Sequence, residues 1–140
     1  EAFAAAEATY RAYVAAGNEI DLNDPATFEP VFALTTGDVN SDERKNLSKM
    51  AAQGWTVSGD TAVIWVEGTA WIPEDDEVLS RACIDVSAIE VVDSSGVSQV
   101  QPDRRDQYAI DLTFTAAADA LHGLRIESSV AVEDDRCLAE

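Results

Sequence analysis

The chain has 140 residues, and a chain of this length hides roughly two thirds of the surface that it exposes when unfolded, so we expect one domain spanning residues 1–140. Its 27 acidic and 9 basic residues give a formal charge of −18, which repels phosphate backbones and anionic lipid headgroups and so disfavours nucleic-acid and membrane-surface binding. A cationic partner or a divalent metal is compatible with this charge, although evenly spread acidity also serves solubility alone.

The first predicted element is a long amphipathic helix. Apolar residues recur at three- and four-residue spacing from Phe3 onward, which places Tyr10 and Tyr13 on one helix face. The same pattern predicts that this helix ends near Ile20 or Leu22.

Two shorter helices are predicted to follow. Asp24 can cap exposed amides while Pro25 occupies a first turn, so a short helix is expected to begin there. A second capping signal at residues 35–38 predicts a third helix, which Gly54 is placed to end.

From Trp55 onward the apolar period changes from helical to alternating. Strands are predicted at residues 61–72, 78–87, 108–115 and 124–133, with 89–92 either extending the second strand or forming another. In the first strand, one face is expected to carry Ala62, Ile64, Val66 and Ala70. The last two strands are joined by a short link and are expected to pair antiparallel. Helices grouped before strands predict an α+β fold, with the N-terminal helices packed on one face of a curved, mostly antiparallel sheet.

The two cysteines are the most informative pair of residues. Cys83 lies in a predicted strand, and Cys137 follows the last strand near the end of the chain. Their spacing fits no redox or zinc motif, which favours a structural disulfide over two free buried thiols or a redox pair. A disulfide that persists indicates an oxidising compartment.

Several patterns that could carry a metal or catalysis are weak. Asp38, Asn40 and Asp42 are spaced like the start of a calcium loop, but the required glycine is replaced by Glu43, so helix capping is the favoured interpretation. The only histidine, His122, falls in a predicted turn and is expected to be a solvated surface residue. We therefore predict no catalytic residue, no metal and no cofactor.

The pocket-lining candidates are Tyr10, Tyr13, Trp55 and Trp65. They could line a ligand pocket or form part of the core, since apolar periodic positions usually pack. Asp85 and Asp111 could in principle supply an acid there, but each alternates with apolar neighbours and is expected to face away from them.

A resemblance to a known fold family emerges from the order of these elements. The chain has an aromatic-bearing first helix with Tyr10-Arg11-Ala12-Tyr13, then two shorter helices that end at Gly54-Trp55, and then a run of long strands. This order resembles the nuclear-transport-factor-2-like fold, which is cone-shaped and cystatin-like. More narrowly, the chain resembles exported or lipid-anchored cell-envelope proteins of Gram-positive bacteria. The segments that carry the likeness also include residues 54–59, 83–87, 92–96 and 134–137. This resemblance implies that Cys83 and Cys137 are bonded.

The expected location follows from the cysteines and the resemblance. No apolar run approaches the roughly 20 residues that span a bilayer, so we expect no transmembrane segment in this chain. The chain opens as Glu1-Ala2-Phe3, which is typical of a helix and not of a signal peptide, so an exported protein would need a leader outside this sequence. We expect an extracytoplasmic protein, secreted or lipid-anchored.

The leading functional hypothesis is a non-catalytic binding or interaction domain whose partner is an unknown protein or small-molecule ligand. One alternative is an isomerase-like or cyclase-like enzyme with a pocket between helices and sheet. Another is an acidic immunity or interaction module whose carboxylates neutralise a basic partner. Sheet-to-sheet pairing in this fold also makes a homodimer plausible.

Overall fold

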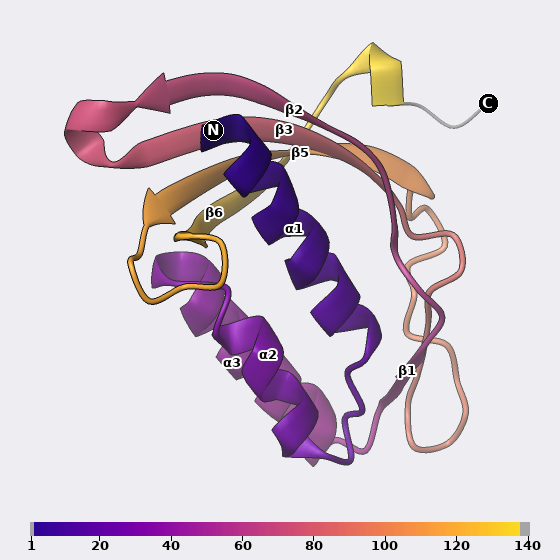
Figure 1. Cartoon of the computed structure of the whole chain (residues 1–140). Coiled ribbons are helices and arrows are strands. Elements are labelled where there is room, and N and C mark those ends of the chain that lie inside the picture. The colour runs from indigo at the N-terminus through magenta and orange to yellow at the C-terminus, as the bar shows by residue number, and fades with distance from the viewer. Residues whose placement is uncertain (1, 138–140) are drawn as a thin grey trace.

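A four-stranded antiparallel sheet with the order β2-β3-β5-β6 dominates the computed structural model, which describes residues 2–137. Its strands are β2 (Ala62–Ile72), β3 (Glu77–Asp85), β5 (Gln107–Ala116) and β6 (Leu124–Val132). The sheet curves over α1 (Ala2–Asn18), and α2 (Glu29–Phe32) and α3 (Gly37–Ala52) lie on the same side (Figure 1). The α+β fold with N-terminal helices packed on an antiparallel sheet is thereby confirmed.

The first helix ends earlier than its apolar pattern predicts. It stops at Asn18 and not near Ile20 or Leu22. The Asn18 side chain donates to the carbonyl of Thr61 (3.1 Å) and accepts from its amide (2.8 Å), so its polar groups bind the start of β2. This tertiary contact joins the end of α1 to the sheet.

The second and third helices begin where their capping signals predict. Asp24 accepts a hydrogen bond from the amide of Ala26 (3.2 Å) and starts a 3₁₀ turn, Pro25–Phe28, which leads into α2. The link between α2 and α3 docks on the outer edge of β6, where the amide of Thr36 donates to the carbonyl of Ile126 (2.8 Å). This docking fixes α3 beside the sheet.

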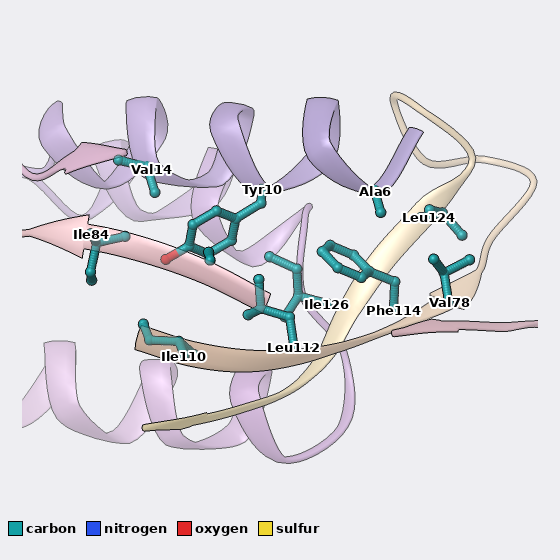
Figure 2. Packing of buried hydrophobic residues seen from close by; sticks show 11 residues of the cluster. Ala6, Tyr10, Val14, Val78, Ile84, Ile110, Leu112, Phe114, Leu124 and Ile126 are labelled. Carbon is teal, nitrogen blue, oxygen red and sulfur yellow. The ribbon is translucent and has the colours of Figure 1, made fainter. Parts of the chain in front are cut away.

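The main core lies between α1 and the concave face of the sheet (Figure 2). Phe114 on β5 is fully buried, and Ile126 on β6 is 1 % exposed. Ala6 on α1 has no exposed surface, because the small side chain allows the helix to approach the strands closely. The alternating pattern of β5 therefore predicted its buried face. In β6 the prediction that Leu124, Ile126, Ser128, Val130 and Val132 share one face holds only for the first two, because the register against β5 shifts after Ile126: Val130 is 56 % exposed and Val132 packs beside Cys83 and Cys137.

The predicted faces of β2 are wrong because the strand contains two irregularities. Its register against β3 shifts between Val63 and Trp65 and again between Gly68 and Ala70. An extra residue at a bulge reverses the alternation that follows it. Val63 and Val66 consequently both pack on the core, whereas Ile64 is 46 % exposed.

The segment after β3 forms a separate strand and does not prolong β3. This strand, β4 (Glu90–Val92), pairs antiparallel with β1 (Thr56–Ser58) in a two-stranded sheet. Gly59 connects β1 to β2 with a φ of +86°, and a Cβ atom there would lie 1.9 Å from the carbonyl oxygen of Ala88. Only glycine fits this close approach of two backbones.

Candidate functional site

A cleft of about 490 Å³ opens where α1, α3 and the β1–β2 connection meet the sheet. Its apolar walls come from both helices and strands, and they include Val14, Val31, Val57, Ile84, Val86 and Ile110. Its polar side chains include Tyr10, Tyr13, Glu43 and Tyr108. Apolar walls with a few inward polar groups are typical of small-ligand sites.

Tyr10 and Tyr13 lie one helical turn apart on α1, and both line the cleft. Their rings stack with centroids 5.9 Å apart and planes inclined by 28°. The Tyr13 hydroxyl donates to Oε1 of Glu43 on α3 at 2.5 Å, which ties the two helices together at the cleft wall.

The tyrosine hydroxyls of the cleft stay protonated at neutral pH. Burial raises the pKa of Tyr10, and burial together with the neighbouring Glu43 carboxylate raises that of Tyr13. Burial also raises the pKa of Tyr108 on β5, against a smaller opposing effect of Arg104. The cleft therefore presents neutral phenols that can donate or accept hydrogen bonds.

The structure does not bring the two candidate tryptophans to this cleft. Trp55 packs beside the smaller apolar cluster formed by Leu22, Phe28, Val31, Phe32 and Leu47. Trp65 packs against the cluster of Cys83 and Cys137, which lies on the opposite face of the sheet from α1. Neither tryptophan is among the described residues that line the cleft.

A disulfide joins Cys83 on β3 to Cys137 in the terminal 3₁₀ turn, Asp135–Cys137. The two cysteines are 0 % and 1 % exposed, and their Cα atoms are 5.6 Å apart. Figure 1 shows that this turn lies on the side of the sheet away from the helices. The bond thus holds the end of the described chain on the convex face.

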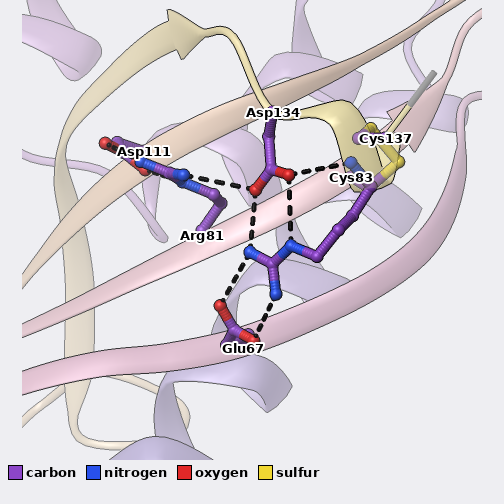
Figure 3. Close-up of polar contacts among 7 residues, drawn as sticks. Glu67, Arg81, Cys83, Asp111, Asp134 and Cys137 are labelled. Atoms are coloured by element: carbon purple, nitrogen blue, oxygen red, sulfur yellow. Dashed lines mark hydrogen bonds and ion pairs between the residues drawn. A yellow bond between two sulfur atoms is a disulfide. The ribbon is translucent and has the colours of Figure 1, made fainter.

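An ion-pair chain lies beside the disulfide on the convex face (Figure 3). Arg136 donates to Glu67 (2.9 and 3.1 Å) and to Asp134 (2.7 and 3.1 Å). Arg81 donates to Asp134 (3.2 Å) and to Asp111 (2.6 and 3.0 Å). The hydrogen bonds from Arg136 lower the pKa values of Asp134 and Glu67 below their ordinary range.

The guanidinium of Arg136 also lies over Trp65, 5.0 Å from the ring centroid. Trp65 packs against the two cysteines, and their burial limits access of reductants to the sulfur atoms. We name this assembly of Trp65, Glu67, Cys83, Asp134, Arg136 and Cys137 the terminal clasp.

The other sequence candidates have structural roles. Asp111 pairs with Arg81 on the convex face, and Asp85 accepts from Ser87, so both face away from the cleft as their alternation predicted. Asn40 donates to the carbonyl of Phe32 (3.2 Å) at the start of α3. His122 is exposed in the link between β5 and β6. Within residues 2–137, no group of three or more histidine, cysteine or acidic side chains is arranged to hold a metal.

Sequence reasoning missed Glu43 and Tyr108 as members of the cleft. Tyr108 shares its strand phase with Ile110, which offered a signal for an inward side chain. Glu43 lies 30 residues from its partner Tyr13, and only the docking of α3 brings the two side chains together.

Comparison with known proteins establishes a fold likeness. The intermembrane-space region of the chloroplast protein ARC6 is similar at a TM-score of 0.61 and 12% identity, covering 94% of this chain and 97% of that chain. A periplasmic fragment of TraM has a TM-score of 0.52 at 10% identity, covering 93% and 96%. The putative transfer protein TraH of the Gram-positive conjugative plasmid pIP501 has a TM-score of 0.51 at 11% identity, covering 94% of each chain.

No protein-family model matches the chain, and no curated protein sequence matches it. The helices of residues 2–137 include none with the length and apolar character needed to cross a membrane. At identities of 10–12%, the likeness to the three solved structures shows a shared fold alone.

Proposed function

We propose that this chain is an extracytoplasmic binding domain at a cell envelope, and that the cleft beside Tyr10 and Tyr13 is its binding site. The observation that carries the proposal is the buried disulfide between Cys83 and Cys137. Disulfides persist in oxidising compartments and are rare in the reducing cytosol, so this bond favours a location outside the cytoplasmic membrane.

The structural likenesses support the same location. Two of the three similar structures are described as an intermembrane-space region and a periplasmic fragment. The finer assignment within the proposal is a nuclear-transport-factor-2-like domain of a secreted or lipid-anchored envelope protein. The long first helix, the two shorter helices and the curved sheet support that assignment.

The chemistry of the cleft supports binding. Its tyrosine hydroxyls have raised pKa values and remain neutral hydrogen-bonding groups at physiological pH. Apolar side chains from α1, α2 and the sheet surround them. A ligand can therefore bury apolar surface against the cleft walls and form a few polar contacts with the hydroxyls. Small-ligand sites obtain affinity from such burial and orientation from such polar contacts.

The location is tested with the full-length protein in the cells that naturally produce it. We expect a tagged copy to be degraded when protease is added to intact cells, while a cytoplasmic marker protein stays intact. Recovery of the protein only inside the cytoplasmic membrane, protected until the cells are lysed, would contradict the proposed function.

A further inference from the structure

The charged side chains that line the cleft are acidic. Glu43 and Asp60 contribute carboxylates, and the described residues that line the cleft include no lysine, arginine or histidine. Tyr108 also lines a second hollow of about 530 Å³, to which Arg104 and Arg105 belong. Neither arginine belongs to the described lining of the cleft. Arg104 donates to the carbonyl of Ile89 (3.0 Å), which is a lining residue, and also pairs with Asp106, while Arg105 pairs with Glu133. The charged side chains of the described lining itself are therefore both acidic.

The hydroxyl of Tyr10 is available for hydrogen bonding in the cleft. The Tyr10 side chain is only 2 % exposed and lines the cleft, and its hydroxyl has no hydrogen-bond partner among residues 2–137. Figure 2 shows the side chain extending from α1 with its oxygen toward the strand that carries Ile84, and both residues line the cleft. A ligand that displaces water from the cleft must replace the hydrogen bonds of this hydroxyl, because a polar group that is desolvated without a partner costs free energy.

Glu43 is also only partly used. Tyr13 donates to its Oε1, and no described residue donates to Oε2. A carboxylate accepts several hydrogen bonds, and its strongest partners are charged donors. Tyr10 and Tyr13 line the same cleft, and aromatic rings attract cations that lie within about 6 Å of the ring centroid.

These observations discriminate among ligand classes. An anion would be repelled by Glu43 and would find no cationic side chain in the described lining of the cleft. A purely apolar molecule would desolvate Glu43 and leave the Tyr10 hydroxyl without a partner. A cation on an apolar body satisfies the carboxylate, the hydroxyl and the apolar walls together.

We infer that the cleft binds an organic cation, an ammonium or guanidinium group carried on an apolar body, with Glu43 as its counter-ion and Tyr10 as an accepting hydroxyl. The inference rests on the proposed function, because it takes the cleft as the binding site, and it adds the chemical class of the ligand. Such a group is found on free amphipathic amines and on the basic side chains of a protein partner.

The inference is tested with three probes of equal chain length and different charge. Heptylammonium, heptan-1-ol and heptanoate are titrated into the isotopically labelled, oxidised full chain, and amide shifts are followed by nuclear magnetic resonance. We expect heptylammonium to shift resonances around Tyr10, Tyr13 and Tyr108. We also expect it to bind at least about tenfold more tightly than heptan-1-ol, because a charge-assisted hydrogen bond contributes that difference in affinity. Heptanoate is expected to bind most weakly.

Matched variants assign the selectivity to the named side chains. Glu43→Gln should weaken heptylammonium binding about tenfold or more and leave heptan-1-ol binding unchanged. Asp42→Asn is the control, because it removes one negative charge from an exposed position on the same helix. Tyr10→Phe retains the ring and should weaken heptylammonium binding severalfold. Well-dispersed spectra of each variant show that it is folded.

A capped Leu-Lys-Leu peptide distinguishes the two sources of the cation. Tighter binding of the peptide than of heptylammonium would support a protein partner's lysine, and the reverse order would support a free amine. Equal affinity for all three heptyl probes, unchanged ammonium binding in Glu43→Gln, or no shift at the cleft with any probe would overturn the inference. The protease test of location is independent of these results, so a failure here is distinguishable from a failure of the proposed location.

Discussion

Removal of the Cys83–Cys137 disulfide is expected to cost a large part of the stability of the fold. The two cysteines are 54 residues apart in sequence, so their bond closes a long loop in the unfolded chain. In the chain-entropy model, opening such a loop raises the entropy of the unfolded state and lowers the free energy of unfolding by about 4 kcal/mol at 25 °C. Typical domains have only about 5–15 kcal/mol in total.

The assay is urea unfolding of the oxidised chain and of the double variant Cys83→Ala/Cys137→Ala, followed by circular dichroism. Both cysteines are almost fully buried, and alanine leaves no polar group in their place. The side chains that form the ion pairs of the terminal clasp are unchanged in the variant, so the comparison reports the loss of the covalent bond together with two buried sulfur atoms. A difference in unfolding free energy below about 1 kcal/mol would refute the reasoning, because the clasp would then hold the chain end without the disulfide.

Three further predictions concern other parts of the fold. Gly59→Ala should lower the free energy of unfolding by more than about 2 kcal/mol, because it combines a left-handed backbone with a clash against a carbonyl. Gly96→Ala has a similar φ but open space around it, so it should cost about 1 kcal/mol. Chemical unfolding of both variants checks the order. Phe114→Ala removes a fully buried ring and should cost about 3–5 kcal/mol in the same assay; a cost below about 1 kcal/mol would contradict the described core. Hydrogen bonds from Arg136 lower the pKa of Asp134 in the folded state, so the Asp134 carboxylate stabilises the fold at pH values above its unfolded pKa near 4 and loses this effect as the pH falls. Asp134→Asn should therefore lower the free energy of unfolding at pH 7 and make that free energy fall less steeply below about pH 4. An unchanged dependence of stability on pH in acid would count against the ion pair.

The parts of the fold that depend on local pattern could be predicted from the sequence. The alternation of β5 identified its buried face, that of β6 did so as far as Ile126, and Asp24 and Pro25 marked the start of the second helical segment. These signals are local because a strand or a helix start is determined by nearby residues.

The features that were mispredicted or left open depend on contacts between distant segments. The β2 faces changed because its register against β3 shifts twice, which no alternation within β2 reveals. The end of α1 depends on the contact of Asn18 with Thr61, and the pairing of β4 with β1 joins segments on either side of two long strands.

The candidate site was predictable only in part for the same reason. Tyr10 and Tyr13 are turn neighbours on one helix, so their spacing alone places them together. Glu43 reaches them through the docking of α3, and Trp65 lies on the convex face with the disulfide. Sequence spacing could not have distinguished Trp65 in the terminal clasp from a pocket residue, because apolar side chains occupy both faces of β2.

The redox state of Cys83 and Cys137 in protein isolated from its natural source tests the central claim most directly. The cells are lysed in a denaturant that contains an alkylating reagent, so that buried thiols also react, and the intact mass is measured before and after reduction. We predict that neither sulfur is alkylated until a reductant is added, after which both are. Alkylation of both thiols in the denaturant without reduction would show that the chain resides in a reducing compartment and would contradict the account.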